Sequence, residues 1–132
     1  MIGLDTNILV RFLTQDDPVQ SSRARQIIER QLTEENRGFV SLATMFETAW
    51  VLEKIYKLSD REVAETIKGI LQIETLFIQN EQEVYTAMVI LQTGRGSFAD
   101  ALINALGLWA GCDSTLTFDR KASRLQGFEL IA

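Results

Sequence analysis

Short apolar runs alternate with longer segments of mixed polarity along the whole chain. The runs resemble strands and cover residues 1–4, 39–40, 75–78, 115–118 and 128–131. In the longer segments the apolar residues recur three and four positions apart, a spacing that places them on one face of a helix. The pattern therefore predicts strands that alternate with amphipathic helices.

Residues that favour the N-cap position of a helix stand before five of these segments. They are Asp17, which precedes Pro18, and Ser41, Ser59, Asn80 and Ser97. We expect the helix after Ser41 to pack on the sheet through an apolar face formed by Leu42, Met45, Phe46 and Ala49. Trp50 and Trp109 also lie at helical spacing, so we predict that both belong to the core.

The order of the elements predicts the fold class. A helix between two strands forms a crossover connection, which produces a mostly parallel sheet with helices on both faces. A chain of 132 residues has the size of one domain. We therefore predict an α/β sandwich formed by a single domain that spans residues 1–132.

The composition is that of a folded, soluble protein. Hydrophobic residues make up 46% of the chain and charged residues 23%, enough apolar surface for a core. The most apolar window, residues 101–112, is shorter than the ~20 residues that span a bilayer. No basic region precedes an apolar one at the N-terminus. We expect a cytoplasmic protein that does not interact with membranes.

The residue types exclude several kinds of active site. There is no histidine, and Cys112 is the only cysteine. This excludes intrachain disulfides, zinc sites built on these residues and histidine-based general bases. Any chemistry must use carboxylates. The net charge of -5 opposes attraction to a polyanion, so a nucleic-acid ligand would need metal ions or a local basic cluster.

Four carboxylates are the candidates for that chemistry. Asp5 and Asp119 each end a predicted strand, at the edge of a parallel sheet where ligands bind. Asp5 is the only charge in residues 1–10, Glu47 the only charge in residues 41–52, and Asp100 the only charge in residues 97–112. A buried carboxylate must be protonated, hydrogen-bonded or neutralised, and a divalent metal is the simplest cation here.

Each acid also has a purely structural interpretation. Asp5 and Asp119 could cap the segments that follow them, and Asp100 could complete a capping box with Ser97. Two polar stripes on otherwise apolar helices favour a shared site instead. One stripe comprises Thr44, Glu47, Thr48 and Val51, and the other comprises Asp100 and Asn104.

The same residues resemble the PIN-domain ribonucleases. The resemblance rests on Asp5-Thr6-Asn7 after the first strand, Glu47 followed by Trp50 and Leu52, the run Phe98-Ala99-Asp100-Ala101-Leu102, and the run Thr117-Phe118-Asp119-Arg120. Within this family, the compact length is similar to that of a VapC-type toxin of a toxin-antitoxin pair. The resemblance covers essentially the whole chain.

The resemblance implies a three-layer α/β/α sandwich whose parallel sheet has about five strands. It also implies Mg²⁺ or Mn²⁺ at an acidic cluster, an RNA substrate, a homodimer and inhibition by a cognate antitoxin. Asp5, Glu47, Asp100 and Asp119 stand where the family keeps its metal-binding and catalytic acids. Many relatives have another acid two positions after the fourth, where this chain has Lys121. The four acids supply enough carboxylate ligands for one metal ion. A second metal ion is less certain, because Lys121 replaces an acid that could have bound it.

Neighbouring polar residues are secondary candidates. Thr6, Asn7 and Thr117 could support a carboxylate or a metal-bound water, although turn chemistry explains them equally well. Five basic residues could hold RNA phosphates or could be solvated surface charges: Arg11, Arg95, Arg120, Lys121 and Arg124.

The implied reaction is metal-dependent hydrolysis of an RNA phosphodiester bond, with 5′-phosphate and 3′-hydroxyl products. Two alternatives stay open. A catalytically silent PIN-like module could bind RNA or act as a scaffold. A receiver-like signalling domain also has an acidic pocket, but it needs an aspartate at the end of a mid-chain strand, and neither residues 39–40 nor 75–78 are followed by one.

Overall fold

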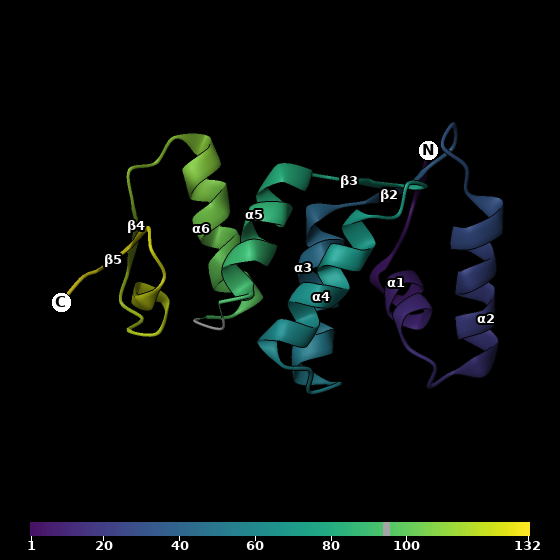
Figure 1. Ribbon diagram of the computed structural model, residues 1–132, viewed down its shortest axis with the longest axis horizontal. Helices are drawn as coiled ribbons and strands as arrows, with labels where there is room; N and C mark the ends of the chain where they lie inside the picture. The colour runs from purple at the N-terminus through teal and green to yellow at the C-terminus, as the bar shows by residue number, and fades with distance from the viewer. Residues whose placement is uncertain (94–95) are drawn as a thin grey trace.

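The computed structural model describes residues 1–93 and 96–132 (Figure 1). Its strands are β1 (Ile2–Gly3), β2 (Gly38–Val40), β3 (Leu76–Ile78), β4 (Thr115–Thr117) and β5 (Phe128–Leu130). Its α-helices are α1 (Thr6–Leu13), α2 (Pro18–Gln26), α3 (Leu42–Lys54), α4 (Asp60–Leu71), α5 (Glu81–Leu91) and α6 (Phe98–Ala110). A π-helical segment, Ile27–Gln31, extends α2, and a short 3₁₀ helix covers Ala122–Arg124. The alternation of strands and helices predicted from the sequence is confirmed.

Four of the five predicted helix caps are confirmed. The side chains of Asp17, Ser41, Ser59 and Ser97 each accept a hydrogen bond from a backbone N–H of the first turn of their helix. Asn80 differs, because it has a left-handed backbone conformation (φ 54°) and its side chain makes no capping bond to the backbone. Its amide donates instead to the Glu83 carboxylate.

The five strands are all parallel to their neighbours, but they form two separate sheets. One sheet has the order β1-β2-β3, and the other pairs β4 with β5. The α/β class and the parallel pairing agree with the sequence prediction. The expected sheet of about five strands is divided, because β4 pairs with β5 and not with β1 among the described residues.

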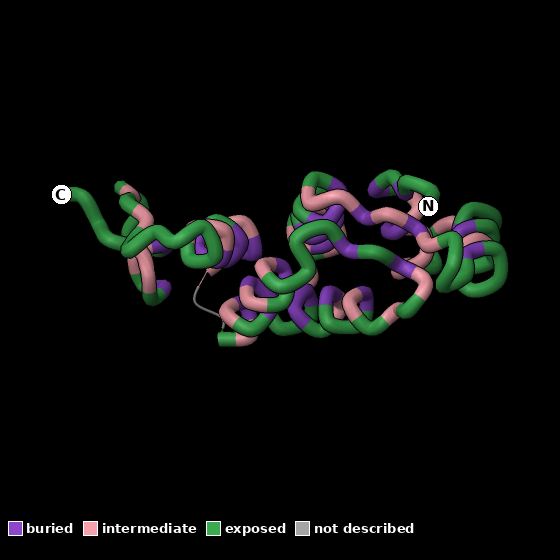
Figure 2. Tube along the Cα trace, turned by 90° about the horizontal axis from the view of Figure 1, so that it is seen from above, coloured by how far each residue is buried: buried purple, intermediate pink, exposed green. Residues whose placement is uncertain are grey.

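The three-stranded sheet packs on the helices through one row of side chains. Val40 and Ile78 are buried on this face, and Gly38 fits closely under the side chain of Leu32. The opposite face is more open. Phe39 stacks on Phe77 there, and Phe77 is 40% exposed. Figure 2 shows this alternation of burial along the strands.

The structure corrects three core predictions. Phe46, Trp50 and Trp109 are 41%, 47% and 55% exposed. The described core consists instead of aliphatic side chains, Met45, Met88 and Phe98. Helical spacing identified an apolar face on α3 and on α6, but no other described element covers the whole of either face.

The molecule is elongated in both overall views. The small β4–β5 sheet lies at one end of the long axis, beyond α5 and α6, and α2 lies at the opposite end (Figures 1 and 2). Among the described residues, no helix is long and apolar enough to cross a membrane.

Candidate functional site

Two of the four candidate acids are linked through Thr6 at the start of α1. The carboxylate of Asp5 accepts the Thr6 backbone N–H at 2.7 Å, so Asp5 is the N-cap of this helix. The Thr6 hydroxyl donates to the Glu47 carboxylate on α3. Thr6 is buried, whereas Asp5 and Glu47 are both exposed. The capping interpretation of Asp5 is thus confirmed, and the capping bond uses one of its two carboxylate oxygens.

The other two acids line a different cavity, between the start of α6, the end of α3 and the segment after β4. Asp100 is half-buried on the first turn of α6, and its backbone N–H donates to the Ser97 hydroxyl at 3.2 Å. Asp119 is exposed. Its carboxylate accepts the Lys121 backbone N–H at 2.8 Å, which closes a tight turn after β4.

Glu53 is an acid that the sequence analysis did not single out. It lines the same cavity as Asp100 and Asp119 and accepts the backbone N–H of Phe98 at 3.2 Å. Burial raises the pKa of the Glu53 carboxyl above its ordinary value, and the negative charges of Asp60 and Asp100 raise it further. The signal that could have indicated Glu53 is its place directly after Leu52, as the second acid of an otherwise apolar helix.

The four predicted acids do not form one cluster. Within residues 1–93 and 96–132, no group of three or more acidic or cysteine side chains is arranged to hold a metal ion. Three of the four side chains are exposed, so the premise that their burial demands a cation is wrong. The donors are split between the Asp5–Glu47 side and the Asp100–Asp119 cavity.

The polar stripes on the helices do not form continuous polar surfaces in the structure. Thr44 and Thr48 are buried, whereas Glu47 is exposed, so the three do not form one polar surface. Asn104 is also buried and donates from its side-chain amide to the Gln126 carbonyl at 2.5 Å. It therefore attaches the segment before β5 to α6.

Comparison with known families decides the assignment. The profile of the PIN domain family matches residues 2–127, which is almost the whole chain. The chain belongs to the PIN domain family. A search of curated proteins found no match. PIN domains are generally nucleases, and the family typically uses a divalent metal.

The secondary polar candidates of this PIN domain differ in the contacts that they make. The Thr117 hydroxyl accepts the backbone N–H of Asp119 at 3.0 Å and so orients the turn that carries this acid. Asn7 is exposed on the first turn of α1. Cys112 is exposed, and Asp113 lies in the bend before β4.

Only some of the basic candidates lie at the Asp100–Asp119 cavity. Arg11 forms an ion pair with Asp16 at 3.0 Å and donates to Gln20 at 2.8 Å. Lys121 and Arg124 line the Asp100–Asp119 cavity, and Arg120 is exposed beside it. Arg95 lies outside the described residues. Lys54 also lines this cavity, which therefore combines carboxylates with three cationic side chains.

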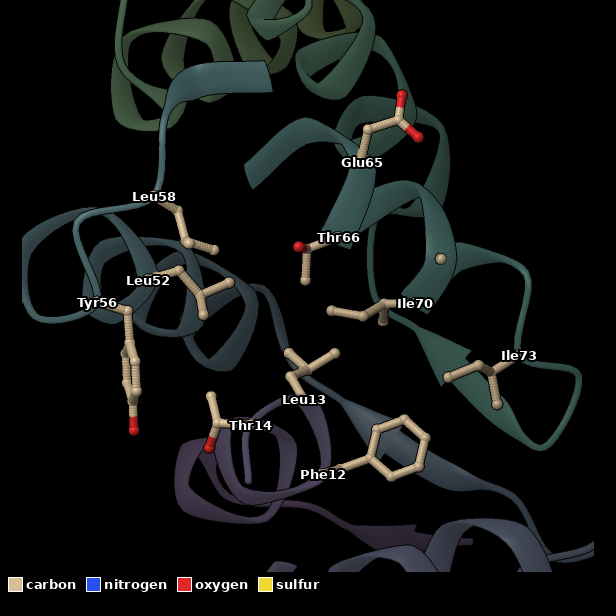
Figure 3. A pocket seen from close by; sticks show the side chains of 11 residues that line it. Phe12, Leu13, Thr14, Leu52, Tyr56, Leu58, Glu65, Thr66, Ile70 and Ile73 are labelled. Carbon is tan, nitrogen blue, oxygen red and sulfur yellow. The ribbon is translucent and has the colours of Figure 1, made fainter. Parts of the chain in front are cut away.

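Two apolar hollows lie apart from the Asp100–Asp119 cavity. One, of about 430 Å³, is formed by residues of α1, α3 and α4, with Phe12, Leu13 and Ile70 among its lining (Figure 3). The other lies between α3 and α6, where Glu47 is bordered by Phe46 and Trp50. Among the described residues that line this second hollow, Glu47 alone is charged.

Proposed function

We propose that this PIN domain, as a single domain spanning residues 1–132, is a metal-dependent endoribonuclease. Its products would carry 5′-phosphate and 3′-hydroxyl ends. The observation that carries the proposal is the family match over residues 2–127, in a chain that has isolated acids after β1, within α3, at the start of α6 and after β4. These acids are Asp5, Glu47, Asp100 and Asp119.

The donor chemistry fits a hard divalent cation. Mg²⁺ and Mn²⁺ prefer oxygen ligands, and the candidate side chains supply only carboxylate oxygens. The four candidate acids would hold the cation only if the Asp5–Glu47 pair and the Asp100–Asp119 pair came together, because the described residues place them in two groups. When bound, such an ion neutralises phosphate charge and lowers the pKa of a coordinated water. Thr6 and Thr117 position Asp5, Glu47 and Asp119 through hydrogen bonds, and Lys121 and Arg124 supply positive charge for an RNA phosphate.

Cleavage of a labelled RNA by purified protein tests the proposal. We expect cleavage with Mn²⁺ or Mg²⁺, loss of cleavage in excess chelator, and product 5′ ends that a 5′-monophosphate-dependent exonuclease degrades. Products with 2′,3′-cyclic phosphate ends would contradict the proposed chemistry. Undiminished cleavage in chelator would contradict metal dependence.

One observation favours a second candidate, a catalytically silent PIN module that binds RNA. The described acids form no cluster of three that could hold a metal. RNA binding without cleavage, unchanged by Asp5→Asn, would support this candidate and exclude the nuclease.

We further propose that the protein is a cytoplasmic toxin of the VapC type, inhibited by a cognate antitoxin. The support is the compact length and the sequence resemblance. Expression of the chain alone should stop growth, and a small protein encoded beside it should restore growth. We expect that partner to place an extended or helical segment, with a basic side chain, against the acidic site. Normal growth at high levels of folded protein would exclude the toxin role.

A further inference from the structure

Helix α2 carries a positive charge in a chain whose net charge is negative. The helix and its π-helical extension cover residues 18–31 and contain three arginines, Arg23, Arg25 and Arg30, against one acid, Glu29. Their net charge is therefore +2, whereas the net charge of the whole chain is -5. An acidic protein attracts a polyanion only through metal ions or a local basic cluster. The segment formed by α2 and its extension supplies a basic cluster of this kind.

Four residues of this segment form one stripe on the side that faces away from the protein. Ala24 and Ile28 are buried and define the inner side of the helix. The outer side is occupied by residues that recur three and four positions apart and are all exposed. These residues, which we call the α2 stripe, are Val19, Arg23, Gln26 and Arg30. Figure 2 shows exposed residues along this outer side of α2.

The two arginines of the α2 stripe are not neutralised by acids. Arg25, on the flank of the helix, forms an ion pair with Glu29 at 3.8 Å. Within the described part of the chain, no acid forms an ion pair with Arg23 or Arg30. Arg23 donates instead to the side-chain amide oxygen of Gln26 at 3.3 Å. Both guanidinium groups of the stripe can therefore bind an anion.

The side chains of the α2 stripe suit a phosphate backbone better than a protein or a membrane. A guanidinium group binds phosphate through two hydrogen bonds, and the Gln26 amide and the exposed Ser22 hydroxyl beside it are further donors. The core of a protein interface and the face of a membrane-bound helix are both apolar. The stripe has one apolar residue, Val19, and the apolar side of α2 is buried in the protein. The side chains therefore favour RNA phosphates.

The stripe lies within reach of a strand that passes the Asp5 side of the candidate site. Asp5 caps the start of α1, and α2 runs back past α1 (Figure 1). Arg11 on the last turn of α1 donates to Gln20 of α2 at 2.8 Å. α1 has 8 residues and is about 12 Å long. A stacked strand advances about 3.4 Å per nucleotide, so about four nucleotides extend from Asp5 to α2.

We propose that the α2 stripe binds phosphates of single-stranded RNA outside the cleavage site, through Arg23 and Arg30. The two arginines are separated by about 10.5 Å along the helix, or about three nucleotide steps, so each holds a different phosphate. The identity of the bound polymer rests on the proposed function. The stripe contributes affinity for the substrate, needs no metal ion and takes no part in the chemical step.

RNA binding in excess chelator tests the proposal without cleavage. Arg23→Gln/Arg30→Gln removes two positive charges and introduces residues that form helices well. By fluorescence anisotropy, single-stranded RNA of about 20 nucleotides should bind this variant at least about 10-fold more weakly than the wild type. The slope of log affinity against log salt should decrease by about 1.4, or about 0.7 for each lost phosphate contact.

Arg61→Gln/Lys68→Gln is the matched control. These two residues are also exposed, and their spacing on α4 equals that of Arg23 and Arg30 on α2 and its extension. The control removes the same total charge and should bind RNA as the wild type does. An equal loss in both variants, no loss in the α2 variant, or a wild type that binds no RNA in chelator would overturn the proposal.

Cleavage kinetics separate this proposal from the proposed function. With Mn²⁺, the α2 variant should cleave the longer RNA with a KM raised about 10-fold and an unchanged kcat. A trinucleotide is too short to reach α2 and should be cleaved equally by the variant and the wild type. An equal KM for the longer RNA would overturn the proposal. An inactive wild type would contradict the proposed function, and RNA binding in chelator would then decide the role of α2 alone.

Discussion

The Glu53 carboxylate is half-buried beside two other acids, and this has a measurable consequence for stability. Because its pKa is raised in the folded state, the folded protein holds this proton more tightly than the unfolded chain does. The free energy of unfolding therefore decreases as the pH rises from the ordinary value of 4.5 through the raised pKa. Ionised Glu53 is thus a destabilising group at neutral pH.

Replacement of Glu53 by glutamine should stabilise the protein at pH 7. The amide oxygen of glutamine can still accept the Phe98 N–H, and the substitution removes the ionisation. We expect a higher melting temperature at pH 7 and a shallower decline between about pH 4.5 and pH 7. Glu65→Gln, on the exposed surface of α4, is the control and should leave the pH profile unchanged. A lower melting temperature for Glu53→Gln at pH 7 would show that its charge is stabilising.

Substitution of Asp5 or Asp100 by asparagine should separate catalysis from stability. Asparagine caps helices as well as aspartate does, so Asp5→Asn should change the free energy of unfolding by less than about 1 kcal/mol. Loss of a negatively charged metal ligand should reduce RNA cleavage by at least about 100-fold. Chemical denaturation and a cleavage assay measure the two effects. A fully active Asp5→Asn variant would exclude Asp5 from the site.

At the scale of elements, α6 holds the C-terminal segment through one close contact. Asn104 binds the Gln126 carbonyl, and Gly127 follows with a left-handed φ of 105°. A Cβ at position 127 would collide with the Asn104 side chain. Position 127 therefore requires glycine for two independent reasons, backbone conformation and lack of space.

Gly127→Ala should detach β5 from α6. We expect a loss of about 1–3 kcal/mol in the free energy of unfolding and faster amide exchange in residues 126–131. Gly69→Ala is the matched control, because Gly69 lies in α4 with open space where its Cβ would stand. That variant should gain about 0.4–1 kcal/mol. Equal stability of the two variants would contradict the close packing at Gly127.

At the scale of the whole molecule, the candidate acids are divided between two parts of the chain. The β4–β5 sheet and the β1–β2–β3 sheet each carry part of the proposed site, and they are separate within the described chain. A ligand that binds acids from both parts would stabilise whichever assembly brings them together. Metal binding should therefore stabilise the folded protein.

Addition of Mn²⁺ should raise the melting temperature of the wild-type protein. A single site at 100 times its dissociation constant contributes about 2.7 kcal/mol. The double variant Asp5→Asn/Asp119→Asn should show no such increase, and Mg²⁺ should act in the same direction as Mn²⁺. An unchanged wild-type melting curve at millimolar Mn²⁺ would indicate that the acids serve as caps and not as metal ligands.

The local sequence determined where the helices and strands of this protein lie. Helix caps and helical hydrogen bonds join residues no more than four positions apart, so a local pattern can reveal them. The Ser59 helix cap, the Asp17-Pro18 helix start and the strand predicted over residues 75–78, found at residues 76–78, could all be predicted. Asn80 does not make the predicted capping bond. Asparagine tolerates a left-handed backbone conformation, which the spacing of residues alone does not reveal.

Burial, strand partners and the grouping of the acids were decided only by the tertiary structure. Trp50 is exposed because no described element covers that part of α3, although its spacing resembles that of a core residue. Glu53, and not Glu47, shares a cavity with Asp100, because the start of α6 packs on the last turn of α3. Likewise, the parallel strands predicted by the sequence could join in several orders. These outcomes depend on contacts between residues far apart in the chain, whose relative positions no local pattern specifies.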